Sequence, residues 1–193
     1  MRWASALMLV AAAGCLGPRS DPSTYFLITP AADAGSGASA AMTLGIGPVT
    51  LPGYLDRSEL VTRLSENQLA VSEVERWAEP LPANVSRALA DNLVRLLRPD
   101  DYATYPWYES AGVDYAVAVD MSRFEADSTG AVTLEAAWWI RNGDGSETLR
   151  QDASRIQERA GGVGTDSSVA ALSTALARLA EEIAAAVRSV RGG

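Results

Sequence analysis

The side chains that most often carry catalysis and metal binding are scarce in this sequence of 193 residues. It contains no His and a single Cys, at position 15. A Ser-His-Asp triad or a zinc site made of His or several Cys therefore cannot form, and an intramolecular disulfide is excluded. A hydrolase that uses Ser and acidic groups alone is a weak alternative, because the sequence has no nucleophile-elbow string.

Other candidate sites have simpler structural explanations. Gly45-Ile46-Gly47-Pro48 has two glycines of a dinucleotide fingerprint, but Pro48 removes an amide and no helix follows. The string Gly161-Gly162-Val163-Gly164-Thr165 precedes a helix yet has no phosphate-loop Lys, which favours a loop leading to a helix cap over anion binding. The acidic pairs Asp100-Asp101 and Glu181-Glu182 have no ligand periodicity around them and indicate a solvated surface. We therefore expect no cofactor and no metal.

The charge balance excludes another class. All 16 basic residues are Arg, against 24 Asp and Glu, and the formal net charge is −8. Because nucleic-acid binding depends on cationic side chains that displace counterions from phosphates, we expect no nucleic-acid partner. The length and the 48% of hydrophobic residues fit one globular domain with a substantial core.

The only Cys lies at the end of a signal-like N-terminus. A short positive Met1-Arg2 is followed by an apolar segment, residues 4–13, and by Ala12-Ala13-Gly14 directly before Cys15. A stretch this short does not cross a hydrocarbon core of about 30 Å as a stable anchor. Small residues before a Cys resemble a bacterial lipobox, although Ala12 stands where Leu is commoner. The sequence predicts a lipoprotein signal peptide over residues 1–14 and lipidation of Cys15, with palmitate among the acyl chains; the alternative is an ordinary secretory signal.

The mature chain is predicted to face the periplasm. Removal of residues 1–14 leaves 15 Arg against 24 acidic residues, a net charge of −9. Two or more acyl chains hold a protein firmly to a membrane, since each buried methylene contributes about 0.8 kcal/mol. Leu16 follows Cys15, where Asp generally retains bacterial lipoproteins in the inner membrane, so we expect the outer membrane. Residues 15–24 contain Pro, Ser and Gly without apolar periodicity and are predicted to form a tether.

The first half of the remaining chain reads as strands. The aromatic and branched residues 25–28 fit a first strand, and residues 30–41 contain only small, polar and Pro residues typical of a flexible loop. Residues 43–51 alternate apolar with small side chains before Pro52-Gly53. Residues 60–63 and 68–72 make a plausible hairpin.

Two segments have the apolar spacing of amphipathic helices. Residues 80–98 carry apolar side chains at three- and four-residue steps, ahead of Pro99. A second helix, capped by Asp166 or Ser167, has one stripe formed by Val169, Leu172, Leu176, Leu179, Ile183 and Val187.

Three strands are predicted between these helices. Apolar residues alternate over residues 113–121 and 132–140, with the turn Asp127-Ser128-Thr129-Gly130 between them. Asn142-Gly143-Asp144-Gly145 marks a second turn, and residues 146–155 return as a further strand. The order strands, helix, three strands, helix predicts an α/β fold with a single domain, residues 25–193. Its mixed, largely antiparallel β-sheet is packed with two main amphipathic helices.

Adjacent tryptophans fall on opposite faces of one predicted strand. Trp138 joins the apolar stripe, whereas Trp139 shares its face with Thr133, Glu135 and Arg141. We expect helix residues to cover Trp139; the alternative is that it belongs to a contact patch.

Several short strings together resemble one known family, the PqiC family of lipoproteins. The strings are Tyr25-Phe26-Leu27, Gly45-Ile46-Gly47-Pro48-Val49, Leu55-Asp56-Arg57, Val61-Thr62-Arg63, Asn67-Gln68-Leu69, Arg76-Trp77-Ala78-Glu79-Pro80-Leu81 and Tyr105-Pro106-Trp107, with the Ala- and Leu-rich final helix. The resemblance extends from about Tyr25 to about Val187, with Ser58 where the family usually has Pro. Arg76, Trp77, Glu79 and Pro80 are candidate structural or interface residues.

The resemblance carries expectations about function. It implies an α/β domain without enzymatic activity that acts as an auxiliary subunit of an ABC-type or MCE-type lipid transport system. The expected partners are an MCE-domain protein that bridges the periplasm and inner-membrane transporter components, with the outer membrane engaged through the lipid anchor. A homo-oligomer is compatible with the sequence. Our leading hypothesis is a docking subunit that supports envelope integrity, and the alternative is a periplasmic lipid-binding carrier lipoprotein. A buried apolar pocket favours the carrier, whereas a filled core with exposed aromatic edges favours the docking subunit.

Overall fold

The computed structural model describes residues 22–34, 40–108 and 111–192. Its elements follow the chain in the order β1 (Thr24–Phe26), β2 (Ala40–Thr50), a 3-10 turn η1 (Gly53–Leu55), β3 (Glu59–Ser65), β4 (Gln68–Trp77), α1 (Leu81–Leu97), β5 (Pro99–Thr104), β6 (Tyr115–Asp127), β7 (Ala131–Asn142), β8 (Thr148–Arg159) and α2 (Thr165–Gly192).

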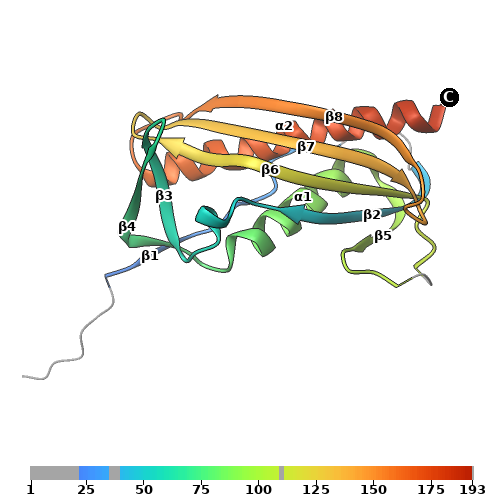
Figure 1. Ribbon diagram of the computed structural model, residues 1–193, viewed down its shortest axis with the longest axis horizontal. Coiled ribbons are helices and arrows are strands. Elements are labelled where there is room, and N and C mark those ends of the chain that lie inside the picture. Colours follow the sequence, from blue (N-terminus) through green and yellow to red (C-terminus); the bar gives the residue numbers. More distant parts are fainter. Residues whose placement is uncertain (1–21, 35–39, 109–110, 193) are drawn as a thin grey trace, which may run out of the picture.

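All eight strands belong to one mixed sheet centred on β6 (Figure 1). One edge of β6 pairs with β7, and β7 pairs with β8, both antiparallel over 11 registered residue pairs. The other edge of β6 pairs in parallel with β2 along its first half and with β3 at Ala126 and Asp127. The predicted mixed, largely antiparallel sheet with two helices in a single domain is therefore confirmed.

Both helices cover the same face of the sheet and pack against each other (Figure 1). The inward residues of β7 that the alternation predicted, from Val132 to Ile140, are all buried, as are those of β6 from Val117 to Met121. On α2 the predicted apolar stripe is buried throughout, and Leu176, Leu179 and Ile183 have no exposed surface. The core is therefore a layer of interlocking side chains between one sheet face and two helices.

The segment after β1 is tied to α1 by two buried asparagines. The side-chain amide of Asn84 accepts the Ile28 N–H at 2.7 Å and donates to the Ile28 carbonyl at 3.0 Å. Asn92 accepts the Ala32 N–H at 2.9 Å. A buried backbone amide without a partner is costly, so these contacts hold a non-regular segment inside the fold. The loop predicted for residues 30–41 is thus shorter at both ends, since Ala32 is buried and β2 already begins at Ala40.

The structure corrects three details of the predicted element order. A strand that the sequence did not indicate, β5, follows α1 directly and pairs in parallel with β2. The hairpin strand β4 continues to Trp77, five residues beyond the predicted end. Helix α2 begins at Thr165, before the predicted caps Asp166 and Ser167. In each case pairing or packing with a distant segment extends an element beyond its local apolar pattern.

Candidate functional site

Cys15, the predicted lipidation site, lies outside the described residues, as does most of the predicted tether. The last residues of that tether join the folded body. Thr24 pairs with Glu75 at the start of β1, and the hydroxyl of Ser23 accepts a hydrogen bond from Arg76 Nε at 3.2 Å. Ser23 and Thr24, at the end of the predicted tether, are therefore part of the β1–β4 region.

The string from Arg76 to Leu81 turns the chain from sheet to helix. Arg76 lies near the end of β4, opposite Glu59 of β3, and its Nη1 is 3.0 Å from Glu59 Oε1 and 3.1 Å from Ser58 Oγ. Both members of this ion pair are about one-third exposed, so its contribution to stability is screened by solvent. Its geometry fixes where the start of β3 meets the end of β4.

Trp77 belongs to the core. It is 7% exposed and packs in the apolar cluster that contains Leu55 and Leu81. The Trp77 N–H donates to the Ser58 carbonyl at 2.7 Å, and the next amide, Ala78, donates to the Phe26 carbonyl at 2.9 Å. Trp77 and Ala78 thus tie the end of β4 to Ser58, the residue before β3, and to Phe26 of β1.

Glu79 and Pro80 line a surface recess of about 360 Å³ together with Asp56, Arg57, Ser58, Trp77 and Ala78. Glu79 also pairs with Arg87 of α1. Two of the strings that carry the family resemblance, Leu55-Asp56-Arg57 and Arg76 to Leu81, therefore meet in space. We call the surface that they form the junction recess; it adjoins β1, where the described chain begins.

A second pair of these strings meets at β2. A methyl group added at Gly45 would lie 2.9 Å from Val113 Cγ1 and 3.0 Å from Trp107 Cζ2. One added at Gly47, where φ is +114°, would lie 2.7 Å from Tyr105 Cβ. The two glycines therefore leave room for Tyr105 and Trp107 to pack against β2, and their spacing serves packing instead of dinucleotide binding.

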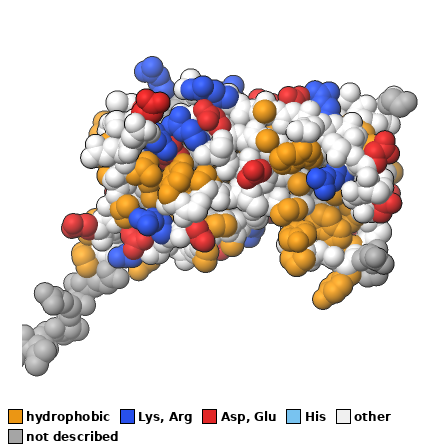
Figure 2. Space-filling view, viewed as in Figure 1, with side chains coloured by type: hydrophobic (Ala, Val, Ile, Leu, Met, Phe, Trp, Pro, Cys, Tyr) orange, Lys and Arg blue, Asp and Glu red, His pale blue; other side chains and the backbone are white. Residues whose placement is uncertain are grey.

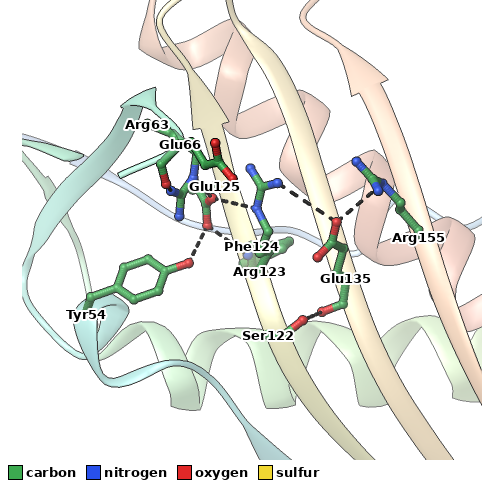
Figure 3. Close-up of polar contacts among 9 residues, drawn as sticks. All are labelled: Tyr54, Arg63, Glu66, Ser122, Arg123, Phe124, Glu125, Glu135 and Arg155. Carbon is green, nitrogen blue, oxygen red and sulfur yellow. Dashed lines mark hydrogen bonds and ion pairs between the residues drawn. The ribbon is translucent and has the colours of Figure 1, made fainter. Parts of the chain in front are cut away.

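Sequence reasoning missed a polar cluster on the sheet face opposite the helices (Figure 3). Glu125 of β6 has a carboxylate that is 1% exposed. Its Oε1 is 2.6 Å from Arg63 Nε and 3.1 Å from Arg123 Nε, and its Oε2 accepts the Tyr54 hydroxyl at 2.7 Å. Glu135 extends the cluster along the sheet, 3.9 Å from Arg123 and 3.3 Å from Arg155.

The cluster shifts the pKa values of its members. Burial raises the pKa of Glu125, but hydrogen bonds from Arg63, Tyr54 and Arg123 lower it by more. The net pKa therefore lies below the ordinary value of 4.5. Burial, followed by the hydrogen bond to Glu125, raises the pKa of Tyr54 to about 12. The carboxylate stays ionised and the phenol stays protonated at neutral pH. β3 and β6 share two registered pairs, and the Arg63–Glu125 ion pair adds a side-chain link between them.

The remaining candidates behave as surface or core. Asp100 and Asp101 are exposed on the edge strand β5, and Glu181 is exposed on α2. The hydroxyl of the buried Ser154 donates a hydrogen bond to the Glu182 carboxylate. The same hydroxyl accepts a hydrogen bond from the Trp138 indole N–H at 2.9 Å. Trp138 is a core residue, as predicted.

Trp139 has a different environment from the one expected. It lies on the sheet face opposite the helices, registered between Ala118 of β6 and Gln151 of β8, and it is partly exposed. The expectation that helix residues cover it is wrong, because both helices lie on the other face, where Trp138 lines a groove with Glu182 and Ala186 of α2.

Within residues 22–34, 40–108 and 111–192, no three acidic or Cys side chains cluster as metal ligands. In the same ranges, no helix combines the length and apolar character needed to span a membrane.

Comparison with known proteins places the chain in a family. A family model described as "ABC-type transport auxiliary lipoprotein component" matches residues 25–184. The comparison with curated proteins finds no match. A crystal structure of protein XCC0632 from Xanthomonas campestris is similar, with a TM-score of 0.73 and 17% identity over 88% of this chain and 97% of that one. A crystal structure of an uncharacterized protein has a TM-score of 0.70 and 19% identity over 86% of this chain and 98% of that one.

Identities this low establish a shared fold alone, whereas the family model covers most of the chain and includes every motif string quoted above. The meeting of these strings at the junction recess and at β2 agrees with that match. The chain belongs to the PqiC-like family of ABC-type transport auxiliary lipoprotein components.

Proposed function

We propose that this chain is a non-catalytic lipoprotein of the outer membrane that docks the periplasm-spanning MCE protein of a phospholipid-transport system. In this role it supports envelope integrity. Acylated Cys15 is the anchor, residues 15–24 give reach, and the folded domain provides the docking surface. The inner-membrane transporter components are engaged through the MCE protein.

The observation that favours docking over carrying is the filled space between sheet and helices. Leu89, Leu93 and Leu176 are fully buried there. A recess of about 50 Å³, lined by residues that include Trp77, Phe124 and Leu172, opens at one end of this layer. Pockets that hold small ligands have volumes of about 300–1,000 Å³. A more open groove of about 420 Å³ lies between β8 and α2, but Arg150, Asp152 and Glu182 line it, and charged groups do not suit an acyl chain. The described core beneath is packed too tightly for a phospholipid acyl chain.

Exposed aromatic side chains are the second support. Tyr102, Tyr105 and Tyr108 are each 46% or more exposed. Aromatic residues are enriched in protein interfaces, because they bury a large apolar area while keeping a polar group in contact with water.

The test is to purify the acylated protein, wash it in detergent, and analyse it by mass spectrometry and by binding to the MCE protein. Docking predicts that binding persists at raised salt, because apolar contacts are not screened, and that the domain retains no phospholipid. Roughly stoichiometric bound phospholipid would instead identify a carrier.

Anchoring has its own test. Cys15→Ser removes the acylation site, so we expect the protein to accumulate as an unprocessed or soluble form, measured by membrane fractionation. A Thr24→Ser variant, which leaves Cys15 intact, is the control. Undiminished fractionation of Cys15→Ser with the outer membrane would contradict the lipoprotein assignment of this site.

A further inference from the structure

An exposed aromatic surface lies at the end of the molecule away from β1. We define it by Tyr105, Trp107, Tyr108 and Val113. Figure 2 shows hydrophobic side chains gathered over this end of the molecule, where β5 lies. The exposed fractions are 59% for Tyr105 and 84% for Tyr108. Trp107, Tyr108 and Val113 also line a cleft of about 420 Å³ with Gly112, Gly143 and Asp144. The aromatic groups thus form one contiguous surface.

The sheet holds this surface in place. The Tyr105 N–H donates to the Ile46 carbonyl at 2.9 Å, and the Tyr105 and Trp107 rings meet edge to face with centroids 5.8 Å apart. Gly45 lies directly beneath Trp107. Aromatic residues that are already ordered lose little conformational entropy on binding, which is the property of interface hot spots.

The charge around the surface is acidic. Residues 98–108, 111–114 and 141–145 contain four Asp and two Arg, Arg98 and Arg141, so their net charge is negative. Asp144 lines the cleft itself, Asp101 lies two residues before Ala103, which pairs with Gly45, and Asp114 directly follows Val113. Segments that lie on a lipid surface combine apolar residues with Lys and Arg, and acidic groups are repelled by anionic lipids. The charge therefore favours a protein partner with basic side chains over a bilayer.

The position of the aromatic surface, far from the predicted anchor, also favours a protein partner over the bilayer. β1 lies at one end of the long axis, and β5 with the loop that follows it lies near the other (Figure 1). β7 runs along this axis for 12 residues, about 40 Å at 3.4 Å per residue. Six residues lie between Cys15 and Pro22, and the seven Cα-to-Cα steps from one to the other reach at most about 25 Å. An anchor at Cys15 thus holds the β1 end close to the membrane and leaves the aromatic surface free to face the periplasm.

We propose that this aromatic surface is the docking site for a protein partner that presents apolar side chains bordered by Arg or Lys. This inference rests on the proposed function and assigns a place on the domain to the partner. The junction recess lies at the other end, next to β1 and the predicted anchor.

The experiment measures binding of the MCE protein to the acylated protein in detergent, with three variants. Tyr105→Ala combined with Tyr108→Ala should raise Kd about 30-fold or more, the effect of truncating a hot-spot aromatic. Tyr25→Ala removes a tyrosine of similar exposure, 56%, at the β1 end and should leave Kd unchanged. Asp101→Arg, on the exposed edge strand, should weaken binding, because it places a like charge opposite the basic partner. Circular dichroism checks that each variant is folded.

The outcomes separate this inference from the proposed function. If the MCE protein binds the double variant as tightly as the wild type, the aromatic surface is not the site, while the docking function stands. If the MCE protein binds neither the wild type nor the double variant, both the docking function and this inference fail. Stronger binding of the MCE protein to the Asp101→Arg variant would contradict the proposal that the partner surface is basic.

Two alternative occupants are tested in parallel. Vesicles of phosphatidylethanolamine and phosphatidylglycerol are mixed with the Cys15→Ser protein, which we expect not to float with them. Flotation that the double variant abolishes would make the bilayer the occupant. Sedimentation of both proteins should show the same oligomeric state; a change in the double variant would make a second copy the occupant. Either result overturns the proposal.

Discussion

Replacing Glu125 by Gln tests whether the buried carboxylate joins β3 and η1 to the central strand. The amide keeps the size of the side chain but removes the charge that Arg63 and Arg123 face. Breaking a fully buried ion pair by removing one partner costs about 3–5 kcal/mol. Arg63 and Arg123 have side chains that are 19% and 29% exposed, so water partly compensates them. We therefore expect a loss of about 2–3 kcal/mol in the free energy of unfolding.

Thermal unfolding followed by circular dichroism measures this loss. For a domain of this size, about 1 kcal/mol corresponds to about 2–4 °C, so the melting temperature should fall by about 4–12 °C. Glu135→Gln is the matched control, because Glu135 lies on the same sheet face and contacts Arg155 and Arg123 but is 28% exposed. It should cost less than about 1 kcal/mol. Equal melting temperatures for the two variants would refute the reasoning.

Acid adds an independent check on the same residue. The folded-state pKa of Glu125 is lowered from 4.5, so its ionised form is favoured by folding. The resulting stabilisation is complete above pH 4.5 and is lost as the pH falls toward the lower folded-state pKa. The stability difference between the wild type and Glu125→Gln should thus be constant from about pH 7 to pH 5 and shrink below pH 4.5. A difference that is unchanged down to pH 3 would contradict this assignment.

Three further substitutions probe other contacts. Trp77→Ala should cost about 3–5 kcal/mol, because it empties a core site, and deplete the protein in cells; unchanged melting and abundance with lost partner binding would instead make Trp77 an interface residue. Gly45→Ala places a methyl group 2.9 Å from Val113 and should lower stability by about 1–3 kcal/mol, whereas Gly53→Ala, with nothing within 4 Å, should be near neutral in the same melting assay. Tyr54→Phe should cost about 1–2 kcal/mol at pH 7. Because the folded-state pKa of Tyr54 is raised from 10.0 to about 12, the wild-type advantage should disappear as the pH rises through that range, as urea titrations at several pH values will show.

The elements that the sequence predicted well are those whose pattern is local. β7 alternates buried and exposed residues from Val132 to Ile140, and α2 repeats its stripe over several turns. Such periodicity reflects burial against one face and needs no knowledge of the partner. β5 has no such pattern in Pro-Asp-Asp-Tyr-Ala-Thr, and it is a strand because β2 offers it a free edge.

The candidate sites show the same limit. The strings Leu55-Asp56-Arg57 and Arg76 to Leu81 were recognised singly, but their meeting at the junction recess depends on the β3–β4 hairpin. The sequence contains one weak indication of the Glu125 cluster, in the apolar pattern of β6. The inward positions on β6 are Val119, Met121 and then Phe124, so the alternation shifts by one residue, where the register with β7 is also irregular. A shift of this kind marks a β-bulge, and bulges redirect side chains.

The two groups of motif strings lie at opposite ends of the long axis, and the elements between them are the longest in the fold. α2 extends for 28 residues, about 42 Å at 1.5 Å per residue, and it packs on β6, β7 and β8. A helix packed along three strands resists bending, so the distance from β1 to the aromatic surface is fixed by the core. Substitutions that loosen the core therefore affect partner binding indirectly, through the position of the docking surface. Tyr108→Ala, at an 84% exposed site, affects binding directly and leaves the melting temperature near that of the wild type.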